Sequence, residues 1–184
     1  MQEALTRLRE DWARRGLPEF RVRIGINSGQ CLAGNVGSRS RLKFTLLGDE
    51  INLAARLESL CKQYGCYLVI SESTFKEPDV ADKFCCRVID RVAVVGKSKA
   101  TVVREVLARR HEATENQLLL ERLSNRMMEE LTSNEIDKCA DTLREMDLLK
   151  PDDLAIKKVS ARVARFQAAP NLEKWSSVEY LLEK

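Results

Sequence analysis

The sequence lacks the features that mark membrane-spanning, secreted and zinc-binding proteins. No apolar run approaches the roughly 20 residues that a bilayer-crossing helix needs, and the first segment is amphipathic and charged, without a signal-peptide core. None of the six cysteines belongs to a Cys-x-x-Cys pair, and His111 is the one histidine. We therefore expect no membrane insertion, no zinc site, and reduced thiols in an intracellular, reducing compartment, the cytoplasm or an organelle.

The sequence also has no large surplus of charge of either sign. Its 184 residues include 31 basic and 28 acidic side chains, a formal net charge of +3. So small a surplus gives no reason to expect a nucleic acid as partner. With 44% apolar and 32% charged residues, the chain has the composition of a globular protein with a buried core.

Glycine is missing from the second half of the chain. All eight glycines lie in the first 96 residues, and the remainder is rich in Leu, Met, Ala, Glu and Lys. Glycine serves tight turns, whereas the other residues favour helix. We expect an α+β fold, with one domain over residues 1–109 and a small all-α extension over residues 110–184.

The spacing of apolar residues predicts the individual elements. The first part should contain a helix over 3–15, a strand over 20–26, and a hairpin turn at Gly29 that returns through 31–33 toward a strand over 44–47. Next come a helix over 50–64, a strand over 66–70, a short helix over 72–76, and strands over 84–95 and 101–107. The extension should contain three helices. The first covers 115–131, the second begins after a capping box at Thr132–Glu135, and the third runs from Pro151 to Gln167.

The helix expected over 50–64 carries the sharpest functional pattern. Its apolar stripe would face the core, and Asn52 and Arg56 project from the polar stripe at i and i+4. A carboxamide and a guanidinium side by side suit phosphoryl transfer, in which catalysis is mostly positioning and stabilisation of charge. The alternative is a solvated helix face on which Arg56 pairs with Asp49 or Glu58.

A second pattern precedes this helix. The segment from Phe20 to Gly48 holds five basic residues and no acidic one, and Gly34 and Gly37 permit close approach to its backbone. An anion such as a triphosphate is one ligand for this segment. A solvated strand face is the other interpretation.

Three motifs together resemble the second half of the catalytic domain of class III adenylyl and guanylyl cyclases. They are Arg23-Ile-Gly-Ile-Asn-Ser-Gly29, Gly34-Asn-Val-Gly37, and the run from Phe44-Thr-Leu-Leu-Gly-Asp-Glu to Glu58. The resemblance continues to Val106-Leu107 and covers about residues 3–108. The remaining residues look like the helical extension that follows the cyclase domain in bacterial-type members, including its Trp-containing end.

The resemblance implies a partial ferredoxin-like cyclase domain and a composite active site. In this family two catalytic domains pair head to tail, one giving two metal-binding aspartates and the other an Asn and an Arg. Asn52 and Arg56 match the second set, so Asn52 would orient the ribose and Arg56 would stabilise the transition state. Thr45 lies where the purine is read and favours ATP over GTP. The reaction would need Mg²⁺ or Mn²⁺ and would give cyclic AMP.

Two departures from the family pattern affect this assignment. The family's metal-binding aspartates precede the helix that starts here at residue 3, so we expect the metal ligands to come from a partner or a missing segment. The family often has a Lys where this sequence has Val95, which leaves Lys97 as the candidate contact to the triphosphate. Asp49 and Glu50 match the start of the Asn/Arg helix, where acidic residues favour the helix dipole, and not the metal site.

The resemblance also implies a partner, because the strands of the absent half would leave the sheet open. Another cyclase domain or a host protein would cover it. Three functions remain open at this point. The chain is the Asn/Arg half of an adenylyl cyclase, a catalytically inactive cyclase-like subunit with a docking role, or a module that binds nucleotide without turnover.

Overall fold

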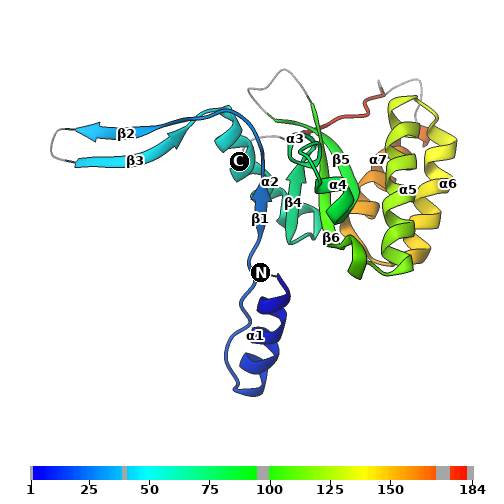
Figure 1. Cartoon of the computed structure of the whole chain (residues 1–184). Coiled ribbons are helices and arrows are strands. Elements are labelled where there is room, and N and C mark those ends of the chain that lie inside the picture. The colour runs from blue at the N-terminus through cyan, green and yellow to red at the C-terminus, as the bar shows by residue number, and fades with distance from the viewer. Residues whose placement is uncertain (1, 39–40, 95–99, 169–174, 182–184) are drawn as a thin grey trace.

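The computed structural model describes residues 2–38, 41–94, 100–168 and 175–181. These form a mixed sheet with helices on both faces, and a separate two-stranded hairpin that projects from it (Figure 1). The α+β class expected from the sequence is confirmed. The elements in order are α1 Gln2–Arg14, β1 Ile24–Ile26, β2 Leu32–Ser38, β3 Arg41–Leu47, α2 Asp49–Tyr64, β4 Leu68–Ser71, α3 Glu72–Phe75, α4 Val80–Lys83, β5 Phe84–Val94, β6 Thr101–Arg109, α5 Glu115–Thr132, α6 Ile136–Leu149, α7 Leu154–Ala168 and β7 Glu179–Leu181.

The main sheet has five strands in the order β1-β4-β6-β5-β7. The β1–β4 and β5–β7 pairs are parallel, and the two pairs between them are antiparallel. Within the described residues β1 forms one edge, and β7, supplied by the extension, forms the other. The extension, expected to be all-α, is therefore mainly helical but also contributes a strand that joins it to the sheet.

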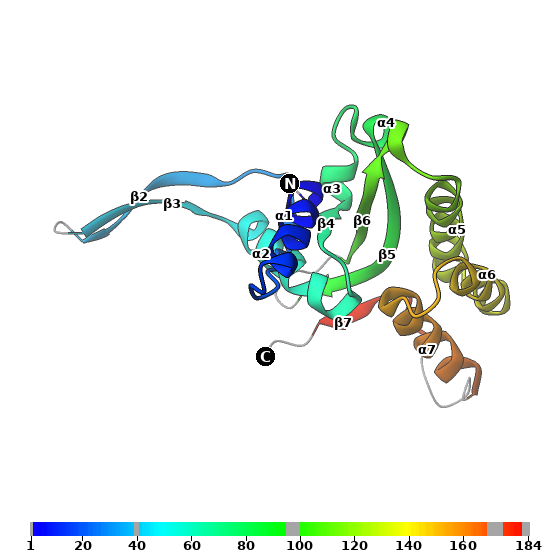
Figure 2. The same ribbon diagram turned by 90° about the horizontal axis from the view of Figure 1, so that it is seen from below.

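Two buried clusters of apolar residues lie on opposite faces of this sheet. Side chains alternate along a strand, and Val103 of β6 belongs to the cluster under α2, while Val102 packs against the cluster under α5. Figure 2 shows α2 on one side of the sheet and α5 and α6 on the other, and α7 contributes residues to both clusters. Burial on both faces explains why apolar residues of β5 occur at neighbouring positions and not only at alternate ones.

The hairpin of β2 and β3 extends away from the rest of the molecule (Figures 1 and 2). The prediction of a hairpin at Gly29 is wrong: β1 pairs with β4, much later in the sequence, and β2 pairs with β3 instead. Residues 27–31 leave the sheet, and Gly29 lies against the side chain of Glu50. Alternation of apolar residues identified the strands, but it carries no information about which strand is the partner.

The helices of the extension begin differently from the prediction. The capping box occurs at Thr114 and Gln117, at the start of α5, whereas Glu135 precedes α6 without a side-chain cap. Helix α7 begins at Leu154 and not at Pro151, because the carboxylate of Asp153 accepts hydrogen bonds from the first backbone N–H groups of α7. The division into domains 1–109 and 110–184 stays a prediction.

Candidate functional site

Helix α2 divides into a buried face and an exposed face, as the sequence predicts. The buried residues are Leu53, Leu57, Leu60, Cys61 and Tyr64. On the other face Asn52 is exposed and Arg56 is half-buried. Residues four apart on a helix have Cβ atoms about 6 Å apart, so the two polar side chains are neighbours.

Close packing against β1 fixes the position of α2. A Cβ atom added to Gly25 would lie 2.3 Å from the backbone nitrogen of Glu58 and 2.4 Å from the carbonyl oxygen of Ala54. Only glycine permits this approach of strand and helix backbones. The helix then ends at Gly65, which has φ 69° in the left-handed region.

The other two predicted site residues lie elsewhere. Thr45 is half-buried on β3, directly opposite Gly34 of β2 in the register of the hairpin. Gly34 leaves open space beside Thr45, since a Cβ atom there would meet nothing within 4 Å. Lys97 and Val95 fall outside the described residues.

The basic character of the segment 20–48 is partly neutralised. The Nε atom of Arg21 donates to Glu19 Oε1 at 2.7 Å, and this hydrogen bond lowers the pKa of Glu19 and raises that of Arg21. Arg23, Arg41 and Lys43 are exposed. Glu19 therefore partly neutralises Arg21, and the exposure of Arg23, Arg41 and Lys43 fits the solvated-face interpretation.

The described residues do not form a metal site by themselves. Among them, no group of three or more His, Cys, Asp or Glu side chains is placed to hold a metal ion. Glu50, at the start of α2, instead accepts a hydrogen bond from Asn27 at 2.7 Å. We therefore derive no catalytic step through a metal held by these residues.

Two buried ion clusters were missed in the sequence. In the first, Arg87 donates to Glu105 and to Asp153, both at 2.7 Å. Burial opposes ionisation of Asp153, but the hydrogen bonds and charges of Arg87 and Lys150 outweigh it and lower the pKa of this carboxyl. The sequence does hold a signal for these clusters, namely the charged residues inside the mostly apolar segment Cys85–Val95. A charged side chain that is buried with its strand requires a partner of opposite charge.

The second cluster joins the extension to α2. Asp90 accepts hydrogen bonds from Arg162 of α7 and, at 2.9 Å, from the hydroxyl of Tyr64, the last residue of α2. Burial, together with the charge of Asp90, raises the pKa of Tyr64. Both clusters are neutralised internally, so we assign them to packing and not to catalysis.

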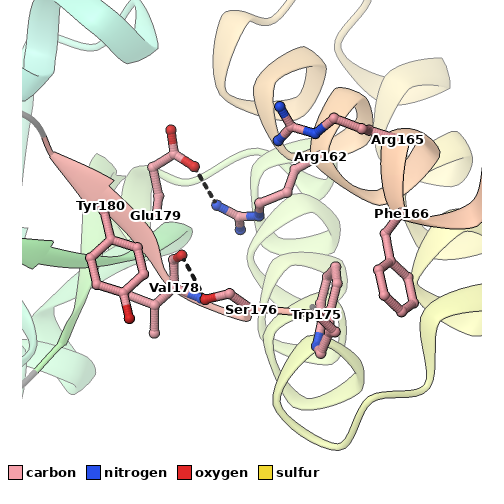
Figure 3. Close-up of a pocket in the computed structure, with 8 residues that line it drawn as sticks. All are labelled: Arg162, Arg165, Phe166, Trp175, Ser176, Val178, Glu179 and Tyr180. Atoms are coloured by element: carbon pink, nitrogen blue, oxygen red, sulfur yellow. Dashed lines mark hydrogen bonds and ion pairs between the residues drawn. The ribbon is translucent and has the colours of Figure 1, made fainter. Parts of the chain in front are cut away.

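A pocket of about 260 Å³ lies between α7 and β7. Figure 3 shows Arg162 directed toward Glu179, and the rings of Phe166 and Trp175, with centroids 5.1 Å apart, line another part of the pocket. The guanidinium of Arg162 is already paired with Asp90 and Glu179. Because the charge of Arg162 is already neutralised by these carboxylates, it would attract an anionic ligand only weakly. The pocket is therefore a weaker candidate for the functional site than the outer face of α2.

Comparison with known proteins identifies the first part of the chain. The family model of the adenylate and guanylate cyclase catalytic domain matches residues 1–105. The chain belongs to this family. Since the match includes α2 and the hairpin, Asn52, Arg56 and Thr45 all lie in the part that carries the family signature.

The relatives agree with this assignment. The chain is 40% identical over 113 residues to an adenylate cyclase of Anabaena cylindrica, covering 59% of this chain and 22% of the relative. It is 38% identical over 92 residues to adenylate cyclase 1 of Rhizobium meliloti, covering 50% of this chain and 14% of the relative. The chain thus spans less than a quarter of either relative.

A solved structure has a similar fold. The adenylyl cyclase CyaB from P. aeruginosa matches with a TM-score of 0.50 and 31% sequence identity, over 61% of this chain and 56% of that chain. The α+β fold is therefore shared with a cyclase structure over part of each chain. None of the helices in the described ranges is long and apolar enough to cross a membrane.

Proposed function

We propose that this chain contributes the Asn52 and Arg56 half of a composite active site that converts ATP to cyclic AMP. One observation carries the proposal: both side chains project from the outer face of a helix whose inner face is locked into the core, within the region that matches the cyclase family. A rigid helix holds two polar groups in a fixed relation, as stabilisation of developing charge requires. The whole protein's activity, substrates and partners belong to this proposal, since the chain spans only part of each relative.

Each of the two residues has a role that its chemistry supports. In the reaction the 3′-hydroxyl of the ribose gives its proton to a carboxylate of the partner domain or to solvent, its oxygen bonds to the α-phosphorus, and the bond to pyrophosphate breaks. The carboxamide of Asn52 has donors and an acceptor with which to orient the ribose. The guanidinium of Arg56 has five N–H donors that fit phosphate oxygens, and such a donor is worth on the order of 3 kcal/mol in the transition state.

Thr45 and Lys97 complete the proposed nucleotide site. The open space that Gly34 leaves beside Thr45 gives a flat base room next to a hydroxyl group. We assign Thr45 to the purine, with ATP preferred to GTP, and Lys97 to the triphosphate. Mg²⁺ or Mn²⁺ would supply positive charge for the phosphates, held by carboxylates that the described residues do not provide.

The proposed partner is a second cyclase domain. The register places Leu42 and Phe44 on one face of the hairpin and Leu32 on the other, with exposed fractions of 64%, 67% and 76%. A two-stranded ribbon with apolar side chains on both faces is not stable by itself and requires a covering surface. A second domain that covers the hairpin would also bring its own carboxylates to the site. Two expectations from the sequence remain predictions: the chain binds no nucleic acid, and it acts in an intracellular compartment.

A complementation assay tests the function. The chain is mixed with a cyclase domain that keeps its metal-binding aspartates but has lost its own Asn and Arg, and Mn-ATP is added. We expect cyclic AMP from the mixture and not from either component. Gln63→Ala, an exposed change on the same helix, is the matched control and should leave the rate unchanged.

The remaining alternatives are outcomes of the same assay. None of the comparisons favours a catalytically inactive docking subunit. A complex that forms but makes no cyclic AMP would support that subunit, and ATP binding without product would support a nucleotide sensor.

A further inference from the structure

The first turn of α2 lacks the usual side-chain cap. The residue before it is Gly48, with φ 146°, which has no side chain to cap the helix, and only its carbonyl accepts from Ile51 and Asn52. Helix starts of this kind fray unless another group holds them, because the first four N–H groups have no partner inside the helix. Asn52 lies only one turn beyond this start.

Asn27, just after β1, holds this turn from outside. Its Nδ2 atom donates to the backbone oxygen of Glu50 at 3.1 Å and to Glu50 Oε2 at 2.7 Å. Gly29 makes room for the contact, because a Cβ atom there would lie 2.5 Å from Cγ of Glu50. The motif Arg23–Gly29 thus meets α2 at three points, Gly25, Asn27 and Gly29.

The other side of the Asn27 carboxamide is fixed as well. Its Oδ1 atom accepts a hydrogen bond from Ser73 Oγ at 2.9 Å, and Ser73 Oγ lies 2.8 Å from Ser71 Oγ, the cap of α3. Acceptors lie on one side and a hydroxyl donor on the other, so the network requires both functions of an amide. An aspartate at position 27 would place a carboxylate against that of Glu50.

We propose that Asn27 is a positioning residue for the α2 site: it ties the first turn of α2 to β1 and α3 and so sets the orientation of Asn52 and Arg56. The proposal rests on the proposed function for its catalytic consequence. A small displacement of groups that act in the transition state lowers kcat by up to about 100-fold with little effect on ground-state binding.

Two readouts test the proposal. For Asn27→Ala we expect amide hydrogen exchange at Leu53 and Ala54 to become about tenfold faster, with no change in α5. A tenfold change corresponds to the loss of one or two hydrogen bonds at their net value. In the complementation assay kcat should fall at least tenfold while KM for Mn-ATP stays within about twofold. Asn116→Ala, an exposed change on α5, is the matched control for both.

A charge pattern separates positioning from general loss of stability. Asn27→Asp should be worse than Asn27→Ala, and Glu50→Gln in the Asn27→Asp background should recover part of kcat, since the glutamine amide can donate to the new carboxylate. The proposal would be overturned if Asn27→Ala left amide exchange in α2 unchanged or made it faster in all elements alike. It would also be overturned if the double variant recovered no kcat. If the wild-type mixture makes no cyclic AMP, the proposed function fails, and the exchange data still decide whether Asn27 orders α2.

Discussion

Arg162 on α7 and Asp90 on β5 form a buried two-bond ion pair. Nη2 donates to Oδ1 at 2.7 Å, and Nη1 donates to Oδ2 at 3.0 Å. The side chains are 9% and 1% exposed. Because Tyr64 of α2 shares the same carboxylate, a residue beyond the family match at 1–105 is connected to the helix that carries Asn52 and Arg56.

Removing Arg162 should strongly destabilise the fold. Arg162→Met leaves the Asp90 carboxylate buried without its cation, a change that typically costs about 3 to 5 kcal/mol. Urea unfolding followed by circular dichroism measures the free energy of unfolding. The exposed Arg165→Met on the same helix should change it by less than about 0.5 kcal/mol, and equal losses in the two variants would contradict the account.

The Arg87–Asp153 pair should make stability depend on pH on the acid side. The folded-state pKa of Asp153 is lowered, so its contribution is present above the unfolded value, about 3.9, and is lost as pH falls through the folded pKa. Asp153→Asn should lower the free energy of unfolding at pH 7 and reduce its loss between about pH 4 and pH 2. Urea titrations across this range are the measurement, and an unchanged slope would count against the ion pair.

The close contact between Gly25 and α2 predicts that alanine is far more destabilising at Gly25 than at Gly34. Gly25→Ala forces a Cβ atom into the backbone of α2 and should cost more than about 2 kcal/mol of stability, since backbone cannot move aside as a side chain can. At Gly34 a Cβ atom meets nothing within 4 Å, and Gly34→Ala should be nearly neutral. Thermal unfolding of both variants tests this, and similar melting temperatures would refute the packing argument.

The cysteines should differ in reactivity. Cys31 is exposed, whereas burial raises the pKa of Cys85 to about 11 and those of Cys86 and Cys139 to about 12. Because the thiolate is the nucleophile, brief treatment of the folded protein with iodoacetamide at pH 8 should give one adduct, at Cys31. Mass spectrometry of the digested protein measures this, and Cys31→Ser should remove the adduct. Rapid modification of a buried cysteine would contradict the described core.

Local patterns predicted the long helices and the two faces of α2, but not the short helix α4 or the start of α7. The apolar stripe of α2 and its polar counterpart follow directly from a period of 3.6 residues, so the sequence alone predicts that Asn52 and Arg56 lie on the outer face. The same stripe also gave the buried residues of α2 correctly.

Long-range pairing was beyond the reach of local patterns. Ile24 pairs with Leu68 across α2, and no feature of either strand specifies this partner over the adjacent β2. The buried pairs of Arg87 and Asp90 likewise depend on Asp153 and Arg162 in the extension. Asn27 belonged to a motif of the family, yet its contact with Glu50 appears only when β1 lies beside the start of α2.

The rate of cyclic AMP formation by Asn52→Ala and Arg56→Ala in the complementation mixture tests the central claim most directly. Loss of one transition-state donor should lower kcat by about 100-fold to 1,000-fold, with the complex and its stability intact. Gln63→Ala should match the wild type. Cyclic AMP formed at wild-type rates by both variants, with the complex present, would show that the outer face of α2 takes no part in catalysis.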